Sequence, residues 1–274
     1  MKEPPKKIVS AELKVLENRS LGGPTRLLAL SAKDLPSQSP HPFPALGRFA
    51  RLRAWAGPPY AGGPLLDRPF SIHRADEERV EFLIRAVGQG TSILGSLAPG
   101  SPVGLIGPLG RGLDAACPDF SEKKWHLLAG GAGLGPMGSI AEALGSKASL
   151  FYGERTAAMA IDCSHLSPSV SVTFATEDGS GPGPKGLATE PLAEALKTDP
   201  RPLFACGPNP MLKAAYFLGK AFSVPVLVCL EARMACGLGA CLSCAVPKKG
   251  GGYLRACLEG PVMDASLIDW EAFS

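Results

Sequence analysis

The strongest constraint on this chain is a group of four cysteines near its C-terminus. Of eight cysteines, Cys236, Cys241, Cys244 and Cys257 fall within 22 residues, with the spacing C-x4-C-x2-C-x12-C. A C-x4-C-x2-C run followed by a distant fourth cysteine is the ligand pattern of plant-type [2Fe–2S] clusters. Gly237, Gly239 and Ala240 lie between the first two cysteines, which suits a tightly curled loop because glycine reaches backbone conformations that other residues avoid. The spacing therefore predicts an iron–sulfur cluster held by these four cysteines.

A structural zinc site is the alternative for the same residues, because four thiolates also suit tetrahedral zinc. Zinc ribbons usually supply their ligands as two short C-x2-C pairs, so the C-x4-C step favours the cluster. A secreted disulfide scaffold is not expected, because such scaffolds are short and cysteine-dense along their whole length. The other cysteines are interpreted as unliganded, small buried side chains, and they are Cys117, Cys163, Cys206 and Cys229.

Charge and hydropathy exclude several kinds of partner. The N-terminal 19 residues contain glutamates and no apolar segment of a secretory signal, and no apolar run reaches the roughly 18 residues that span a bilayer. The formal net charge is only +3, which is too weak a field to argue for nucleic acid or an anionic membrane. We therefore expect a cytoplasmic protein that binds neither nucleic acid nor membranes.

The pattern of strands and helices predicts a multi-domain α/β plus β fold with three domains. In residues 1–115, short β-like runs (7–16, 25–31, 49–55, 80–87 and 101–106) alternate with glycine and proline turns, which predicts an antiparallel β-barrel. In residues 116–225, apolar strands alternate with helical segments, which predicts a parallel α/β sheet. A last strand at 225–230 leads into the third domain, residues 226–274. These residues are too few for an apolar core of their own, so we expect the metal site to stabilise this small domain.

A glycine-rich segment at residues 129–137 lies between an apolar strand and a helix, where a pyrophosphate-binding turn belongs. Gly131, Gly133 and Gly135 are its candidate contacts. The dinucleotide fingerprint G-x-G-x-x-G is incomplete, because Pro136 occupies the position of its third glycine. By itself this segment is a weak indication of nucleotide binding.

The same arrangement, a strand followed by glycine and proline at the start of a helix, recurs at Cys206, Gly207 and Pro208. Open α/β sheets bind ligands outside the carboxyl ends of their strands. Both segments are therefore expected to line one cleft that holds one nicotinamide dinucleotide, NAD. Glu154 ends the strand between them and is interpreted as a solvated loop glutamate, with a ribose hydroxyl as its alternative partner.

Two segments of the predicted barrel carry further candidate contacts. An arginine fork at Arg68 or Arg85 suits a diphosphate, the hydroxyl of Ser71 can hydrogen-bond a flavin ring nitrogen, and Gly-x-Gly-Thr at 88–91 can wrap phosphate with main-chain N–H groups. Taken alone, the plainer interpretation is that both arginines lie on the surface and that Phe70 is a core aromatic.

Together these motifs resemble the ferredoxin reductase superfamily. The resemblance lies in Arg-Pro-Phe-Ser at 68–71, Gly-x-Gly-Thr at 88–91, Gly-Pro-Leu-Gly at 107–110, the glycine-rich run at 130–136 and Cys-Gly-Pro at 206–208. The run 231–247 is more specific and, with Glu-Asp-Gly-Ser at 177–180 and Cys257 close to Glu259, is similar to the electron transfer subunits of NAD-dependent dihydroorotate dehydrogenases. The likeness spans nearly the whole chain.

The resemblance implies that the barrel binds FAD through three segments, with Arg68 at the pyrophosphate and Ser71 near the flavin N5. The superfamily often has a tyrosine stacked on the isoalloxazine where this chain has Phe70. The resemblance also implies that the four clustered cysteines ligate the [2Fe–2S] cluster. The expected FAD segments are Arg68, Pro69, Phe70 and Ser71, then Leu83, Ile84 and Arg85, then Gly90 and Thr91.

The resemblance further implies a function in pyrimidine biosynthesis. Electrons leave dihydroorotate through an FMN in a separate dihydroorotate dehydrogenase catalytic subunit, cross the cluster and FAD, and reduce NAD. The complex is expected to be a heterotetramer with two copies of each subunit, and no residue of this chain is expected to act as a catalytic acid or base. The alternatives are a diaphorase-type subunit that serves a hydrogenase, a ferredoxin or another dehydrogenase, and a zinc-stapled binding module without redox function.

Overall fold

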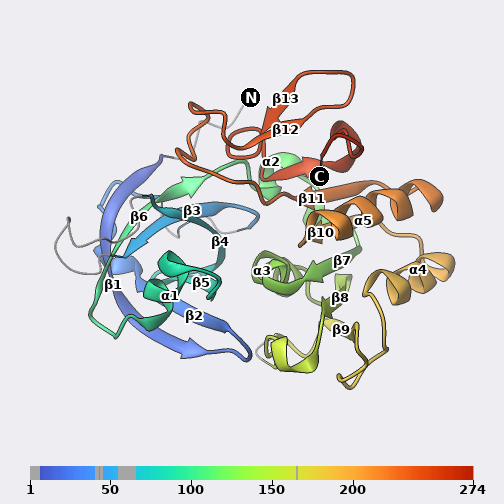
Figure 1. Ribbon diagram of the computed structural model, residues 1–274, viewed down its shortest axis with the longest axis horizontal. Helices are drawn as coiled ribbons and strands as arrows, with labels where there is room; N and C mark the ends of the chain where they lie inside the picture. Colours follow the sequence, from blue (N-terminus) through green and yellow to red (C-terminus); the bar gives the residue numbers. More distant parts are fainter. Residues whose placement is uncertain (1–6, 41–42, 44–45, 55–65, 165, 274) are drawn as a thin grey trace.

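A computed structural model describes residues 7–40, 43, 46–54, 66–164 and 166–273 (Figure 1). Its N-terminal part is a closed antiparallel barrel with the strand order β1-β2-β5-β4-β3-β6. The barrel core is filled by aliphatic and aromatic side chains that alternate along these strands, as period-two burial requires. The strands are β1 (Val9–Ser20), β2 (Thr25–Ser31), β3 (Phe49–Ala54), β4 (Arg68–Ala75), β5 (Arg79–Arg85) and β6 (Pro102–Leu109).

The predicted barrel is confirmed, with two differences in detail. β4 was not among the expected strands, because Arg68–Ser71 was interpreted only as a ligand-binding motif; its pairing with β3 and β5 makes it a central part of the barrel. The expected turn at 88–91 is the first turn of helix α1 (Gln89–Ser96). Trp55, the expected end of the third strand, lies outside the described residues.

The second part is a six-stranded sheet with the order β14-β11-β10-β7-β8-β9. Five of its strands are parallel, and β14 is an antiparallel edge strand. Side chains of consecutive residues in β10 point to opposite faces, which gives the sheet two hydrophobic cores. The strands are β7 (Trp125–Gly130), β8 (Ala148–Glu154), β9 (Ser171–Thr176), β10 (Leu203–Cys206), β11 (Val226–Cys229) and β14 (Val262–Asp264).

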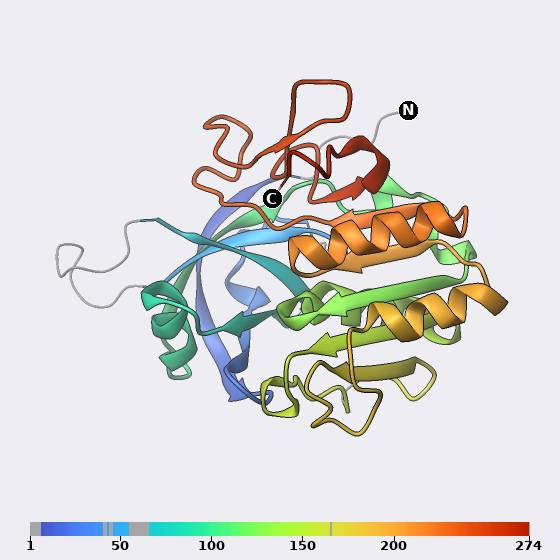
Figure 2. The same ribbon diagram turned by 45° about the vertical axis from the view of Figure 1, so that its right-hand side comes forward.

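Helices cover both faces of this sheet. α3 (Leu134–Leu144) packs on the face turned toward the barrel and also contacts β4, whereas α4 (Thr189–Thr198) and α5 (Asn209–Ala221) cover the other face (Figure 2). A four-residue helix, α2 (Leu113–Ala116), follows the barrel. In the part of the chain that the structure describes, no helix is long and apolar enough to cross a membrane.

The C-terminal segment is not held by its cysteines alone. It forms a short hairpin of β12 (Ala245–Pro247) and β13 (Tyr253–Arg255), and then adds β14 to the central sheet beside β11. Val246, Cys257, Ile268 and Trp270 are buried in the same core as α4 and α5. The described part of the segment has no core of its own but shares the apolar core of the sheet. That a metal site also stabilises it stays a prediction. The sheet also continues across the expected domain limit at residue 225.

Candidate functional site

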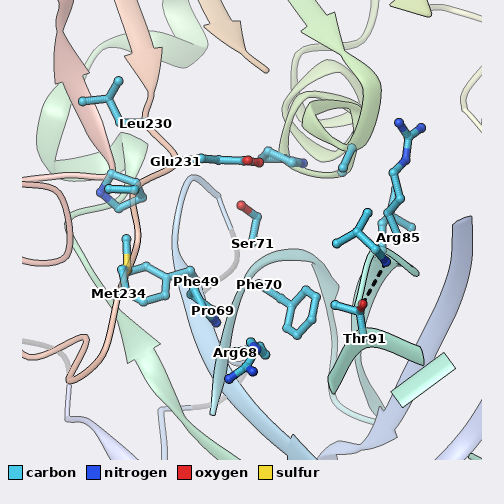
Figure 3. A pocket seen from close by; sticks show the side chains of 17 residues that line it. Phe49, Arg68, Pro69, Phe70, Ser71, Arg85, Thr91, Leu230, Glu231 and Met234 are labelled. Carbon is cyan, nitrogen blue, oxygen red and sulfur yellow. Dashed lines mark hydrogen bonds between the residues drawn. The ribbon is translucent and has the colours of Figure 1, made fainter. Parts of the chain in front are cut away.

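A cavity of about 360 Å³ lies where the barrel, the sheet and the C-terminal segment meet (Figure 3). Its wall combines segments that are far apart in sequence, from β3, β4, β5, α1, the start of α3 and the chain that follows β11. Residues of all three expected FAD segments are among those that line it. The lining residues are Phe49, Arg68, Pro69, Phe70, Ser71, Leu83, Arg85, Val87, Thr91, Ala132, Gly135, Pro136, Leu230, Glu231, Ala232, Met234 and Pro261.

The β4 segment brings Arg68, Pro69, Phe70 and Ser71 to one wall of the cavity. Antiparallel pairing with β3 places Phe70 opposite Ala50 and Ser71 opposite Phe49. The ring of Phe70 and the hydroxyl of Ser71 extend into the cavity (Figure 3). The segment therefore presents an aromatic face, a hydroxyl and a cation to the same space, which suits a flavin nucleotide.

Strand alternation separates the three residues of the β5 segment. Leu83 and Arg85 line the cavity, whereas the Ile84 side chain is fully buried in the barrel core. Successive side chains of a strand point to opposite faces, so Ile84 offers only its backbone to a ligand.

The third expected segment is shaped by helix α1. Thr91 accepts hydrogen bonds through its Oγ1 from the N–H groups of Val87 and Gly88, at 2.9 and 3.0 Å. This bonding caps the first turn of the helix. Gly90 is buried, and a Cβ added there would lie 3.4 Å from the Arg68 Nε, so the glycine leaves room for this arginine.

A second cavity of about 560 Å³ lies at the carboxyl ends of the parallel strands. Gly130 at the end of β7, Glu154 at the end of β8 and Pro208 after β10 line it, together with Gly131 and Met211. This is the place where open α/β sheets bind their ligands. Arg85 and Val87 line both cavities, so the two cavities adjoin.

The glycines and the Cys-Gly-Pro motif do not all reach this second cavity. Gly131 lines it, Gly135 lines the first cavity, and Gly133 is buried where a Cβ would overlap the carbonyl of Cys206. Cys206 itself is 1% exposed, and the adjacent Gly207 is buried. The glycine-rich turn thus lets the chain pass close to β10 as well as shaping the two cavities.

Glu154 is buried, with 4% of its side chain exposed, and forms an ion pair with Arg85 of the barrel. The hydroxyl of Tyr152 donates a second hydrogen bond to Glu154 at 3.0 Å and accepts one from the N–H of Ile161. The interpretation of Glu154 as a solvated loop residue is therefore wrong. Its partner comes from another domain, and 69 residues separate the two in sequence, so no local pattern indicated the pair.

Two of the four clustered cysteines have sulfurs close together, and a third is bonded by main-chain N–H groups. The Sγ atoms of Cys244 and Cys257 are 3.2 Å apart. The Sγ of Cys236 accepts hydrogen bonds from the N–H groups of Leu238 and Cys241 at 3.4 Å. Bonds from these N–H groups lower the pKa of the Cys236 thiol to about 6. Burial raises the pKa of Cys257 to about 12, although the N–H of Gly239 donates to its sulfur.

The arrangement of the cysteines fits a [2Fe–2S] cluster. Such a cluster is held by four cysteines shared between two irons, and hydrogen bonds to the sulfurs tune its potential. The sulfurs of Cys244 and Cys257 are adjacent. Main-chain N–H groups are directed at the sulfurs of Cys236 and Cys257.

Three other residues near the first cavity were not among the predicted site residues. Glu231 retains exposed surface, but its carboxyl points into the cavity, where desolvation raises its pKa against the opposing effect of Arg85 (Figure 3). Met234 and Phe49 add apolar wall. Glu231 and Met234 belong to the run just before the cysteines, so their closeness to that motif was the only available signal.

Comparisons with known proteins agree with this architecture. A family model described as the iron-sulfur cluster binding domain of dihydroorotate dehydrogenase B matches residues 231–269. Among solved structures, the NADH-dependent reduced ferredoxin-NADP oxidoreductase superposes with a TM-score of 0.78 at 22% identity, covering 95% of this chain and 91% of that one. The ferredoxin reductase in carbazole 1,9a-dioxygenase gives 0.64 at 22% identity, covering 81% and 68%. At these identities the two structures show the fold alone.

Sequence relatives are closer. The dihydroorotate dehydrogenase B (NAD(+)) electron transfer subunit of Clostridium acetobutylicum is 37% identical over 224 residues, which cover 81% of this chain and 85% of the relative. The protein of the same name from Caldanaerobacter subterraneus subsp. tengcongensis is 31% identical over 267 residues, which cover 93% and 96%. This chain therefore belongs to the family of dihydroorotate dehydrogenase B electron transfer subunits.

Proposed function

We propose that this protein passes electrons from the FMN of a dihydroorotate dehydrogenase catalytic subunit, through a [2Fe–2S] cluster and FAD, to NAD in pyrimidine biosynthesis. The observation that carries the proposal is the continuity of the cysteine loop with the first cavity. Met234 lines the cavity, and Cys236 follows two residues later. Two residues of extended chain span at most about 7 Å, so the cavity wall leads directly into the cluster loop.

The residues of the two cavities suit two nucleotides. In the first cavity, Arg68 would hold the FAD pyrophosphate, and Phe70, Ser71 and Leu83 would contact the isoalloxazine. In the second, Gly131 and Pro208 would hold NAD. The four cysteines would hold the cluster as the pairs Cys236–Cys241 and Cys244–Cys257. A bound flavin can exchange electrons in pairs with a nicotinamide and singly with an iron–sulfur cluster, which explains its place between the two.

The function is tested by reconstitution with the FMN-containing catalytic subunit. Dihydroorotate-dependent reduction of NAD is expected from the mixture and from neither subunit alone. Gel filtration with detection of flavin and cluster absorbance should show one species containing both chains, and its mass would decide whether the complex is a heterotetramer with two copies of each. Preferential assembly with a hydrogenase or a different dehydrogenase would contradict the choice of partner.

The catalytic subunit is expected to dock on the exposed leucines around the cysteine loop. Leu238, Leu242 and Leu258 are 48%, 60% and 48% exposed, and Cys241 between the first two is also exposed. Exposed apolar side chains in one group mark interaction sites. Docking here would bring the partner's cofactor close to the cluster.

Leu242→Asp should weaken binding of the catalytic subunit at least about tenfold, because a charge would be buried in an apolar interface. Leu242 has a φ of +60°, a conformation that aspartate adopts more readily than leucine, so the substitution adds no backbone strain. The measurement is titration calorimetry with the purified partner. Leu16→Asp, at a 43% exposed leucine of the barrel strand β1, is the matched control and should bind normally.

Arg68→Gln should raise the dissociation constant for FAD about 10- to 100-fold, because a charged hydrogen bond contributes about 1.5–3 kcal/mol. Fluorescence titration of the FAD-depleted protein measures this change. Arg74→Gln is the control on the same strand. Arg74 forms an ion pair with Glu142 of α3 and does not line the first cavity. Equal losses of FAD affinity in both variants would contradict the place assigned to Arg68.

A further inference from the structure

Arg51 of β3 joins the barrel to the cysteine loop. Its Nη1 donates a hydrogen bond to the carbonyl oxygen of Cys236 at 2.8 Å, across 185 residues of sequence. Its Nη2 lies 3.0 Å from the Oδ2 of Asp67. Only 12% of the Arg51 side chain and 11% of the Asp67 side chain are exposed. The guanidinium is thus largely shielded from water and held between one carboxylate and one cluster ligand.

The loop is shaped around this arginine. Gly237 has a φ of +65°, and a Cβ added there would lie 2.7 Å from the Cδ of Arg51. Two independent requirements therefore select glycine next to Cys236, namely the left-handed backbone and the space taken by the Arg51 side chain. The contact between arginine and loop is a close-packed one.

The same network reaches the first cavity. Asp67 directly precedes Arg68, and Phe49, two residues before Arg51 on β3, lines the cavity. β3 therefore presents one side chain to the proposed flavin site and another to the proposed cluster site. A change in the Arg51–Asp67 pair would act at the junction of the two.

A shielded charge at this position has a definite electrostatic consequence. Reduction of an iron–sulfur cluster adds negative charge, and the potential of a cluster depends on nearby charge, on hydrogen bonds and on solvent exposure. A poorly solvated cation next to the loop stabilises the reduced state, because low water content reduces screening. The Asp67 carboxylate opposes this effect and limits its size.

We propose that the Arg51–Asp67 pair is a positioning and tuning element that sets the reduction potential of the cluster held by the cysteine loop. Arg51 raises this potential and anchors the loop through the Cys236 carbonyl, and Asp67 lowers it while orienting the guanidinium. The inference rests on the proposed function, in that it requires the cluster to be present.

The test is an anaerobic redox titration of the cluster-containing protein, followed by electron paramagnetic resonance. Arg51→Met should shift the cluster potential to a more negative value. Asp67→Asn, which leaves Arg51 and its bond to Cys236 in place, should shift it in the opposite direction. Arg53→Met is the matched control: Arg53 lies on the same strand, 3.7 Å from the same Asp67 carboxylate, and its removal leaves the Arg51–Cys236 bond intact, so the shift should be smaller than for Arg51→Met.

The outcomes separate this inference from the proposed function. A wild-type protein that takes up no [2Fe–2S] cluster would contradict the proposed function itself. A wild-type cluster whose potential is the same in Arg51→Met would overturn only the role of the pair. If Arg51→Met does not retain a cluster, the cluster potential of Asp67→Asn is compared with that of the wild type. A raised potential supports the role of the pair, and an unchanged potential overturns it.

Discussion

Replacing Cys241 with serine should remove the cluster absorbance and stop electron transfer from the catalytic subunit to NAD, while NADH still reduces the bound flavin. Iron–sulfur clusters are held by thiolates, and the serine hydroxyl is a much weaker ligand that ionises far less readily. The rate of transfer between the subunits should fall more than about 100-fold, since loss of even a residue that only supports a metal ligand costs about 10–100-fold. None of the four clustered cysteines lines the first or the second cavity. Reduction of the flavin should therefore be unaffected.

Stopped-flow spectroscopy separates the two steps. Flavin bleaching by NADH is followed in the isolated variant, and NAD reduction by dihydroorotate is followed in the reconstituted complex. Cys163→Ser is the control. Cys163 is half-buried and lies outside the cysteine loop, and its thiol donates a hydrogen bond to the carbonyl oxygen of Ile161. Simultaneous loss of both activities in a folded Cys241→Ser protein would contradict the order in which the groups are proposed to act.

Arg85→Met should lower the free energy of unfolding by about 3 kcal/mol or more, because it leaves the buried Glu154 carboxylate without its cation. The melting temperature of this chain should fall by roughly 6–12 °C, at about 2–4 °C per kcal/mol. The double variant Arg85→Met/Glu154→Gln should recover much of the loss, since replacing both members removes the uncompensated charge. Differential scanning calorimetry of the FAD-depleted proteins measures all three, because a bound ligand would add a stabilisation that depends on its own affinity.

The control for this pair is Lys33→Met. Lys33 and Glu78 form an ion pair whose side chains are 71% and 67% exposed, and exposed pairs contribute at most about 1 kcal/mol. A loss of stability in Arg85→Met no larger than in Lys33→Met would show that the Arg85–Glu154 pair does not stabilise the contact between barrel and sheet. Arg85 also lines both cavities, so weaker binding of both nucleotides is expected in the same variant.

Local features of the fold were predictable because their causes are local. The alternation of apolar and polar residues in strands, and the change to strand–helix alternation after the barrel, indicated the barrel and the parallel sheet. β4 was missed because Arg68–Ser71 has the character of a ligand-binding motif, and proline at position 69 is unfavourable in a strand. The first turn of α1 was interpreted as a loop because glycines at 88 and 90 are poor helix formers.

The sequence by itself predicted the class of the metal site, because the C-x4-C-x2-C spacing of Cys236, Cys241 and Cys244 is the plant-type [2Fe–2S] pattern and places the three proposed ligands on one short loop. It also marked the strand ends and glycines that shape the two cavities. Only the tertiary structure decided how these parts are joined. The bond from Arg51 to Cys236 and the pairing of Arg85 with Glu154 link residues 185 and 69 positions apart. Such contacts arise when the barrel packs against the sheet and the cysteine loop, so no pattern confined to one segment can specify them.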